Sequence, residues 1–425
     1  MSTHTGLLRF ITCGSVDDGK STLIGRLLYD SKSLLSDHIT ALEASSRKRG
    51  SREIDLSLVT DGLLAEREQG ITIDVAYRYF STATRKFIIG DSPGHVQYTR
   101  NMVTAASTAD VAVLLVDARA GLQPQTRRHA FLARWIGIPR VLLAVNKMDL
   151  VGWSRERFET IDAEFQAFNA PLGFKEVVSI PMSALLGDMI VERGDELGWY
   201  TGQTLLEYLE DVPARHDESV QPVRFPVQRV VRARRDNVQR GTWFTEDEFR
   251  GYQGTVASGV LRVGDTVVAL PAGNRAQVAE ILTADGPTPA APADRPVTVR
   301  LDREIDVSRG DLFASADSPA RVSQDITADV CWFDAEPAAL SRPYLIKQSV
   351  NSVRAKFQGL DHRIDVQSLK EEPAPATLEM NDIARVRLRT QKPLAFDLYE
   401  ENRTTGAFVV IDERTNRTVA AGTIR

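Results

Sequence analysis

The chain contains the stretch Gly14-Ser15-Val16-Asp17-Asp18-Gly19-Lys20-Ser21, which matches the pattern G-x-x-x-x-G-K-[ST] of a phosphate-binding loop. The apolar run Leu7–Cys13 precedes it and is typical of a strand, and Thr22–Leu28 follows as the start of a helix. This strand–loop–helix context is what the motif requires. Its glycines let backbone N–H groups turn toward phosphate oxygens, and the helix N-terminus adds its positive end. The stretch therefore predicts an α/β nucleotide-binding domain in which residues 14–22 contact the phosphates, with Lys20 at the β- and γ-phosphates and Ser21 on Mg²⁺.

A second motif identifies the base. Asn146-Lys147-Met148-Asp149 follows the apolar run Val141–Val145, so it lies at the C-terminal end of a strand, where ligands bind in open α/β sheets. The carboxylate of Asp149 can accept hydrogen bonds from N1–H and the 2-amino group of guanine. Adenine offers neither donor in that arrangement, so the motif predicts GTP rather than ATP.

Neighbouring residues are predicted to frame the base. Asn146 would hold the adjacent loops and the purine edge, and the stem of Lys147 would pack along the base. Met182-Ser183-Ala184 follows a further apolar run, Val177–Ile180. Through Ser183 and Ala184 this loop is expected to offer a backbone N–H to the guanine O6.

The segment Asp91-Ser92-Pro93-Gly94-His95 supplies the catalytic candidates. It fits D-x-P-G-H and follows the strand-like run Phe87–Ile89. Asp91 is predicted to contact Mg²⁺ through water, and the Gly94 N–H to meet the γ-phosphate. A lone histidine more often caps a loop, but the place of His95 directly after D-x-P-G favours orientation of the attacking water.

Thr72 ends the stretch Glu66–Thr72 and is predicted to complete the Mg²⁺ shell. Phosphoryl transfer needs mainly positioning and charge neutralisation, so a few such groups suffice. The predicted catalytic residues are His95, Lys20 and Thr72, and the predicted metal-binding residues are Ser21, Thr72 and Asp91.

Composition is that of a multidomain globular enzyme. The 425 residues are enough for two or three cores, and 43 % apolar with 26 % charged residues are ordinary values. The net charge of −5 argues mildly against broad nucleic-acid binding. Cys13 and Cys331 form no disulfide framework or zinc spacing, which fits a reducing cytoplasm. The apolar runs are strand-sized and no signal peptide is evident, so we expect no membrane span.

The hydrophobic pattern predicts three domains, residues 1–217, 218–320 and 321–425. In the first, strand-like runs alternate with helical runs, which indicates a mostly parallel sheet flanked by helices. Asp74–Phe80 and Lys86–Ile89 are predicted to be its one antiparallel pair. The second and third domains are rich in short strands and are predicted to be β-barrels.

Two stretches of the strand-rich half carry more detailed expectations. Asp285–Pro296 contains four prolines and is predicted to be an exposed loop. Ile383–Leu388 and Pro393–Leu398 are predicted to be separate strands of the last domain.

The motifs resemble the translation-factor class of GTPases, the group of elongation factor Tu. That class usually carries His and Thr where this chain has Asp18 and Ser21. Longer blocks are instead similar to the CysN family, the large subunit of heterodimeric ATP sulfurylase, and they extend over nearly the whole chain. These blocks include GSVDDGKSTLIGRLLYDS from residue 14, DSPGHVQYTRNMVTAAS from residue 91, WYTGQTLLEYLEDV from residue 199 and ENRTTGAFVVIDERTNRTVAAG from residue 401.

The resemblance implies an elongation factor Tu-like order of a P-loop GTPase domain and two β-barrels. It also implies that GTP hydrolysis drives adenylyl transfer from ATP to sulfate, giving adenosine 5′-phosphosulfate and pyrophosphate in sulfate assimilation. In that family the site for ATP and sulfate belongs to a separate small catalytic subunit, CysD, so a heterodimer is expected. No second phosphate-binding loop occurs in the sequence, so we expect no fused kinase for adenosine phosphosulfate.

Three further positions take their interpretation from relatives. Val16 and Ile71 match the apolar gate that screens the catalytic histidine in translation GTPases, and ordinary packing is the alternative. Asp17 matches an aspartate that helps hold a monovalent cation in some relatives. Arg232–Glu248 is longer than expected and is either an exposed hairpin loop or a contact surface, because its aromatics are flanked by charge.

Two other functions remain open from the sequence. The first is a translation-factor-type GTPase that acts on RNA or the ribosome. The second is a non-catalytic switch that binds GTP only to gate a partner. Stimulation of hydrolysis by ribosomes would favour the first, and binding without turnover would favour the second.

Overall fold

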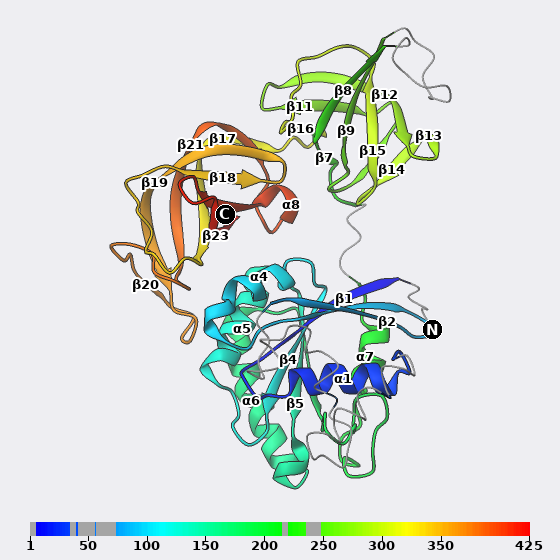
Figure 1. Cartoon of the computed structure of the whole chain (residues 1–425), viewed down its shortest axis with the longest axis vertical. Coiled ribbons are helices and arrows are strands. Elements are labelled where there is room, and N and C mark those ends of the chain that lie inside the picture. The colour runs from blue at the N-terminus through cyan, green and yellow to red at the C-terminus, as the bar shows by residue number, and fades with distance from the viewer. Residues whose placement is uncertain (1–5, 35–39, 41–55, 57–73, 215–219, 235–247) are drawn as a thin grey trace. The chain divides into compact units, whose positions relative to one another are not determined.

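The computed structural model describes residues 6–34, 40, 56, 74–214, 220–234 and 248–425 (Figure 1). The chain divides into a first unit of residues 1–215 with 366–369 and a second unit of residues 216–365 with 370–425. The domain boundaries expected after residues 217 and 320 stay a prediction. No helix in these described ranges is long and apolar enough to cross a lipid bilayer.

The helices and strands of the first unit alternate along the chain. Its strands are β1 (Leu7–Cys13), β2 (Ala76–Ser81), β3 (Lys86–Asp91), β4 (Val111–Asp117), β5 (Arg140–Asn146) and β6 (Glu176–Pro181). Its helices are α1 (Lys20–Asp30), α4 (Thr99–Ala106), α5 (Pro124–Trp135), α6 (Arg155–Leu172) and α7 (Leu205–Asp211), with short 3₁₀ turns η2 (Val96–Tyr98) and η3 (Met148–Val151).

These strands form one six-stranded sheet in the order β2-β3-β1-β4-β5-β6. Only the β2–β3 pair is antiparallel, as predicted, and the other neighbours run parallel. All seven residues of β4 are buried, which is expected of an apolar strand at the centre of a parallel sheet. The carboxyl ends of β1, β3, β5 and β6 therefore bring the predicted motifs to one edge.

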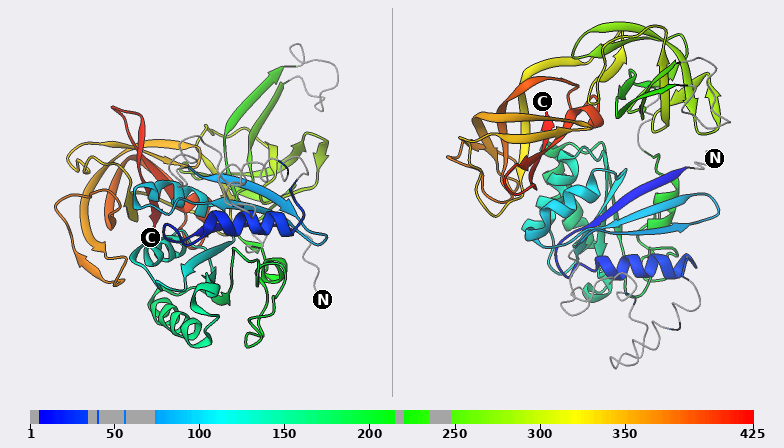
Figure 2. Two further views of the ribbon diagram at one scale, coloured as in Figure 1. Left: turned by 60° about the horizontal axis from the view of Figure 1, so that its bottom comes forward. Right: turned by 45° about the horizontal axis from the view of Figure 1, so that its top comes forward.

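Helices cover both faces of this sheet (Figure 2). Val111 and Val113 of β4 share one buried cluster with Leu23 and Leu27 of α1 and with Leu205 of α7. Helices α4, α5 and α6 pack on the strands from the opposite side, in contact with β1, β4, β5 and β6. Because α1 begins at Lys20, its packing fixes the phosphate loop against the end of β1.

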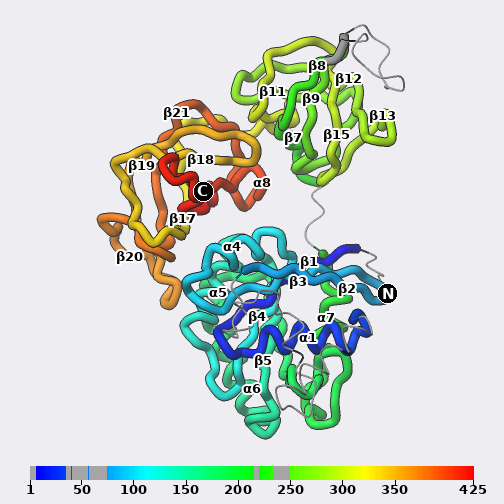
Figure 3. Tube along the Cα trace, viewed as in Figure 1, coloured from blue at the N-terminus to red at the C-terminus, as the bar shows by residue number. Residues whose placement is uncertain are grey.

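The second unit is built almost wholly from strands, whose path Figure 3 traces. Its first part contains β7 (Arg224–Pro226), β8 (Arg229–Arg234), β9 (Glu248–Thr255), β10 (Val260–Arg262), β11 (Thr266–Leu270), β12 (Asn274–Thr283), β13 (Gly286–Thr288), β14 (Ala290–Pro292), β15 (Pro296–Leu301) and β16 (Leu312–Ser315). Its second part contains β17 (Arg321–Trp332), β18 (Tyr344–Gln348), β19 (Asn351–Ile364), β20 (Glu371–Pro373), β21 (Ile383–Phe396), helix α8 (Arg403–Gly406), β22 (Ala407–Asp412) and β23 (Arg417–Ile424).

Each part wraps around an apolar core. In the first, strands follow the order β7-β16-β11-β12-β15-β9-β8 around a cluster that includes Phe225, Tyr252 and Phe313. In the second, the pairing of β18 with both β22 and β19 closes a six-stranded barrel around Trp332 and Tyr344. These features confirm the predicted fold class, an α/β P-loop domain followed by two β-barrels.

Two expectations in the strand-rich half are wrong. Asp285–Pro296 is not a loop: it forms β13 and β14 and leads into β15. Proline is tolerated there because β13 and β14 are three-residue strands and Pro296 is the first residue of its strand. Residues 383–388 and 393–398 are not separate strands, because β21 runs without a break from Ile383 to Phe396, and a register shift in its pairing with β17 absorbs the irregularity.

A buried ion pair joins the two parts of the second unit. Arg224 of β7 donates from Nε and Nη2 to the two carboxylate oxygens of Asp397, each at 2.8 Å. Thr405 donates to the same carboxylate at 2.6 Å. Burial alone would raise the pKa of Asp397, but the bonds from Arg224 and Thr405 hold it below its usual value.

Candidate nucleotide site

The phosphate loop follows β1 and has two positions that only glycine can fill. Gly14 and Gly19 have φ of 149° and 94°. A Cβ on Gly14 would lie 2.7 Å from the Leu115 carbonyl oxygen, and a Cβ on Gly19 would lie 2.5 Å from Asn146 Nδ2. The loop is therefore a shaped backbone cradle whose glycines are required by contact as well as by backbone conformation.

Lys20 lies at the centre of this cradle. Its ammonium donates to the carbonyls of Gly14 at 3.2 Å and Ser15 at 2.7 Å, and the residue is buried. Burial lowers the pKa of Lys20, and the nearby carboxylates of Asp91 and Asp18 oppose that shift. Two carboxylates thus hold a positive charge within the loop that is predicted to bind phosphate.

The Asp91–His95 segment packs against the same loop. Thr12 of β1 donates to Asp91 Oδ1 at 3.1 Å, because Thr12 and Asp91 are register partners in the parallel β1–β3 pair. A Cβ on Gly94 would lie 2.7 Å from Lys20 Nζ, so the Gly94 backbone approaches the cradle closely. His95 is half-buried, and its ring meets the edge of Tyr98 at a centroid distance of 6.2 Å.

The remaining loop residues have distinct places. Asp18 is buried and accepts the Ser15 N–H at 2.6 Å, which stabilises the turn of the loop; burial raises its pKa, against the effect of Lys20. Val16 has 40 % of its surface exposed. Ser21 and Thr22 form the first turn of α1.

Asn146 connects the phosphate loop to the loop after β6. Its Nδ2 donates to the Asp18 carbonyl at 2.8 Å, and its Oδ1 accepts the Ala184 N–H at 2.8 Å. One backbone N–H of the loop that is expected to reach guanine O6, that of Ala184, therefore donates to Asn146. Ser183 is fully buried, and its hydroxyl accepts the Leu186 N–H, which shapes this loop.

Lys147 and Asp149 line the end of β5. Lys147 donates to the Asp17 carbonyl and pairs with Asp117 at 3.0 Å. Burial would raise the pKa of Asp117, but its bonds to Arg119 and Lys147 hold it well below the usual range. Asp149 Oδ1 is buried and, within the described residues, accepts no hydrogen bond. An orphaned carboxylate oxygen at this position is what a guanine-binding aspartate would present.

His129 supports the phosphate loop from α5 and was not predicted from the sequence. His129 is buried, its Nδ1 accepts the Gly14 N–H at 2.9 Å, and its Nε2 lies 2.8 Å from the Gln125 side-chain amide. Burial, together with the positive charges of Lys20 and Arg128, lowers the pKa of His129 to about 3. The ring is therefore neutral at physiological pH and serves as a fixed acceptor.

The structure thus brings most of the predicted residues to one edge of the sheet. All of Glu66–Thr72, with Ile71 and Thr72, lies outside the described residues, as does most of Arg232–Glu248. The predicted residues that surround the cradle and the end of β5 are Gly14, Ser15, Val16, Asp17, Asp18, Gly19, Lys20, Ser21, Thr22, Asp91, Gly94, His95, Asn146, Lys147, Asp149, Ser183 and Ala184.

Comparison with known proteins gives consistent matches over nearly the whole chain. A family model of the elongation factor Tu GTP binding domain matches residues 5–214, and a GTP-eEF1A C-terminal domain-like model matches residues 325–425. The bifunctional enzyme CysN/CysC of Mycobacterium tuberculosis is 52 % identical over 422 residues, which cover 99 % of this chain and 67 % of that protein. Sulfate adenylyltransferase subunit 1 of Bacteroides fragilis is 49 % identical over 98 % of this chain and 86 % of its own length. The protein of the same name from Shewanella oneidensis is 49 % identical, covering 98 % of this chain and 85 % of that protein.

Proposed function

This chain belongs to the family of sulfate adenylyltransferase subunit 1, and on that basis we propose that it is the GTP-hydrolysing subunit of that enzyme. In this role GTP hydrolysis drives adenylyl transfer from ATP to sulfate, which yields adenosine 5′-phosphosulfate and pyrophosphate in sulfate assimilation. The relatives are named for this activity at 49–52 % identity. They do not favour the alternative of a translation factor acting on RNA or the ribosome.

The use of GTP is supported by the presence, in one site, of a phosphate cradle and a carboxylate oxygen that accepts no hydrogen bond among the described residues. Gly14 and Gly19 shape the cradle around Lys20, and Asp149 Oδ1 is buried without a donor among the described residues. Guanine supplies two donors that a carboxylate can accept, and adenine does not supply them there. We therefore assign the phosphates to the loop and the guanine to Asp149.

The residues of the chain would act mainly by position and charge. Lys20 would neutralise charge that builds up on the β- and γ-phosphates, and the Gly94 N–H would bind the γ-phosphate. His95 would orient the attacking water toward that phosphate. Val16 is part of the phosphate loop, where it would help screen His95 until a partner changes the local packing.

A magnesium ion fits the same site. Ser21, at the first turn of α1, would be a direct ligand, Asp91 would contact the ion through water, and Thr72 would complete the shell. Asp91 is buried and receives the Thr12 hydroxyl, so its carboxylate is held in one orientation. When bound, the ion offsets negative charge on the phosphates.

A subunit requires a partner, and we assign the reaction of ATP with sulfate to that partner. The sequence carries one phosphate-binding loop, which the proposal gives to GTP. A small catalytic subunit of the CysD type would then hold ATP and sulfate, in the cytoplasm where both nucleotides are available. Hydrolysis by the large subunit alone would be slow and would quicken when the small subunit is engaged with its substrates.

The test is synthesis of adenosine phosphosulfate by this chain, by the small subunit and by both together, each with and without GTP. We expect synthesis only from the pair, with strong dependence on GTP. Equal synthesis by the small subunit with and without this chain would contradict the assignment, as would robust synthesis by this chain alone. GTP binding without turnover in the complete system would favour a non-catalytic switch, and stimulation only by ribosomes would favour a translation factor.

A further inference from the structure

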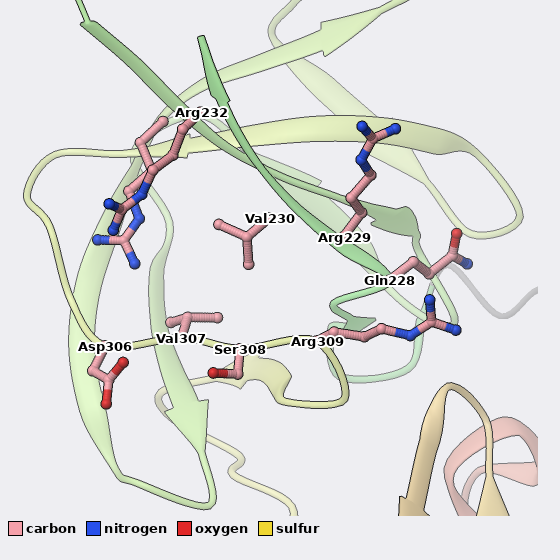
Figure 4. Close-up of a pocket in the computed structure, with 9 residues that line it drawn as sticks. Gln228, Arg229, Val230, Arg232, Asp306, Val307, Ser308 and Arg309 are labelled. Carbon is pink, nitrogen blue, oxygen red and sulfur yellow. The ribbon is translucent and has the colours of Figure 1, made fainter.

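A basic hollow lies on the first strand-rich part of the second unit, within residues 228–309. Its volume is about 600 Å³, which lies in the range of sites that hold small ligands or a few side chains. Strand β8, strand β9 and the segment between β15 and β16 line it, as Figure 4 shows. It belongs to the second unit, whereas the residues of the nucleotide site belong to the first.

The hollow lies where β8 and the segment 306–309 separate, next to two main-chain hydrogen bonds that hold them together. Val227 donates to the Asp311 carbonyl at 2.8 Å and accepts the Gly310 N–H at 2.9 Å. Beyond these bonds β8 pairs with β9 on one side only, as far as the described residues show. The segment 306–309 runs past the other side of β8 without joining it as a strand, so β8 is an edge strand that faces the hollow.

Positive charge surrounds this edge. Arg229, Arg232, Arg250 and Arg309 line the hollow, against the single acidic residue Asp306. Arg229, Arg232 and Arg309 are exposed at the rim of the hollow, and Figure 4 shows them spread around the opening. Such a ring of guanidinium groups suits carboxylates, because each presents several donors in a planar fork.

Arg250 is the anchored member of the ring. One of its terminal nitrogens, Nη1, pairs with Glu304 at 3.1 Å, and the guanidinium lies over the Tyr252 ring at 5.5 Å. Its Nε is buried and, in the described part of the chain, has no hydrogen-bond acceptor. The anchored side chain therefore retains an unused donor beside the hollow.

The floor of the hollow is apolar. Val307 is buried, and half-buried Val230 packs on the core cluster of this part. Both valines lie at the centre in Figure 4, between the arginines. A ligand that fits must present apolar groups inward and negative charge outward, in a form that an edge strand can accept.

We propose that this hollow binds an extended acidic segment of a partner protein, which adds alongside β8. Main-chain hydrogen bonds to an edge strand give such a segment affinity, and side-chain pockets select its sequence. Alternating acidic and apolar residues would place carboxylates on the arginines and apolar side chains on Val230 and Val307. Nucleic acid is the poorer match, because surfaces that bind single strands add aromatic side chains on which bases stack, and none of the described residues that line the hollow is aromatic.

The test uses the full chain and a fluorescein-labelled peptide of alternating Glu and Val, followed by fluorescence anisotropy. We expect Arg229→Glu with Arg309→Glu to weaken binding by about tenfold or more, since close opposite charges become like charges. The matched control, Arg262→Glu with Arg295→Glu, changes two exposed arginines of the same part outside the hollow and should bind as the wild type does. Peptide methylated on alternate backbone nitrogens should also bind about tenfold more weakly, because it cannot donate along β8.

Other outcomes overturn the proposal. Equal loss in the hollow and control variants would mean unspecific charge attraction. Inorganic pyrophosphate that displaces the peptide at equal concentration, together with no effect of methylation, would identify a small-anion site instead. A single-stranded oligonucleotide that binds more tightly than the peptide would identify a nucleic-acid surface. The GTP affinity of each variant reports whether the nucleotide site is intact. If the variant with Arg229→Glu and Arg309→Glu does not fold, the variant with Arg229→Gln and Arg309→Gln replaces it.

Discussion

Replacement of His129 tests how α5 holds the phosphate loop. His129→Leu removes the acceptor of the Gly14 N–H, whereas His129→Asn places an oxygen near the position of Nδ1. A buried donor left without an acceptor costs about 1–3 kcal/mol. In the free protein the loosened loop can turn this N–H to water, but bound nucleotide requires the ordered loop. The cost therefore falls on GTP affinity, which should drop roughly 5- to 150-fold in His129→Leu and much less in His129→Asn.

The same residue should give the first unit a sensitivity to acid. The unfolded chain binds a proton at His129 below about pH 6.5, whereas the folded chain, with a pKa of about 3, does not bind it until far lower pH. Protons then favour the unfolded state, so the free energy of unfolding falls as the pH drops through this window. At pH 5 the loss would be about 2 kcal/mol from this residue.

The assays separate these two effects. Titration with a fluorescent GTP analogue gives the affinities at neutral pH, and hydrogen exchange of the β1 and β4 amides gives the free energy of unfolding at pH 7 and pH 5. Both variants should lose the part of the acid sensitivity that belongs to His129. Wild-type affinity in His129→Leu, or equal loss in the two variants, would refute the role of the Gly14 bond. Unchanged acid sensitivity in both would refute the protonation argument.

Substitutions at four other residues have expected outcomes. Asp149→Asn should lower the affinity for GTP and raise the affinity for xanthosine triphosphate, because an amide can donate to the carbonyl that xanthine presents. Competition titrations that leave the preference for GTP unchanged would contradict base recognition by Asp149. Lys20→Ala should abolish tight GTP binding, whereas His95→Ala should keep binding and lower single-turnover hydrolysis on the order of 10²–10⁴-fold; normal hydrolysis at saturation would exclude His95 from catalysis. Arg224→Ala should destabilise the second unit by about 3–5 kcal/mol in urea unfolding, since it leaves Asp397 charged and buried without its partner. Arg224→Met combined with Asp397→Leu should lower the free energy of unfolding by less than Arg224→Ala does. An equal or larger loss in the double variant would argue against an uncompensated charge as the cause.

The sequence predicted what depends on local spacing. The strand before Gly14 and the helix after Ser21 follow from neighbouring apolar runs, and the place of Asn146 and Asp149 follows from the end of a strand. Because strands of a parallel sheet end at one edge, separate motifs could be assigned to one site. The single antiparallel pair was predicted as well, whereas the order of the strands became known only from the structure.

Other features depend on partners far away in the chain. His129 and Gly14 are 115 residues apart, and nothing near His129 in the sequence distinguishes it from a core histidine. The prolines of residues 285–296 mark a loop by composition alone, but neighbouring strands provide edge positions where a missing N–H costs little. The bond from Ala184 to Asn146 likewise depends on the spatial approach of two loops, which periodicity does not encode.

The two hydrogen bonds of the Asn146 side chain join the phosphate loop to the loop after β6. Its nitrogen donates to the main chain of the phosphate loop, and its oxygen accepts from the loop that we propose to lie beside the base. Ordering of either loop therefore also orders the other through the Asn146 side chain. The conformational entropy that both loops lose is then lost when the first ligand binds, and the second ligand loses less. Guanosine and a triphosphate presented as separate molecules should consequently bind with positive cooperativity, each raising the affinity for the other.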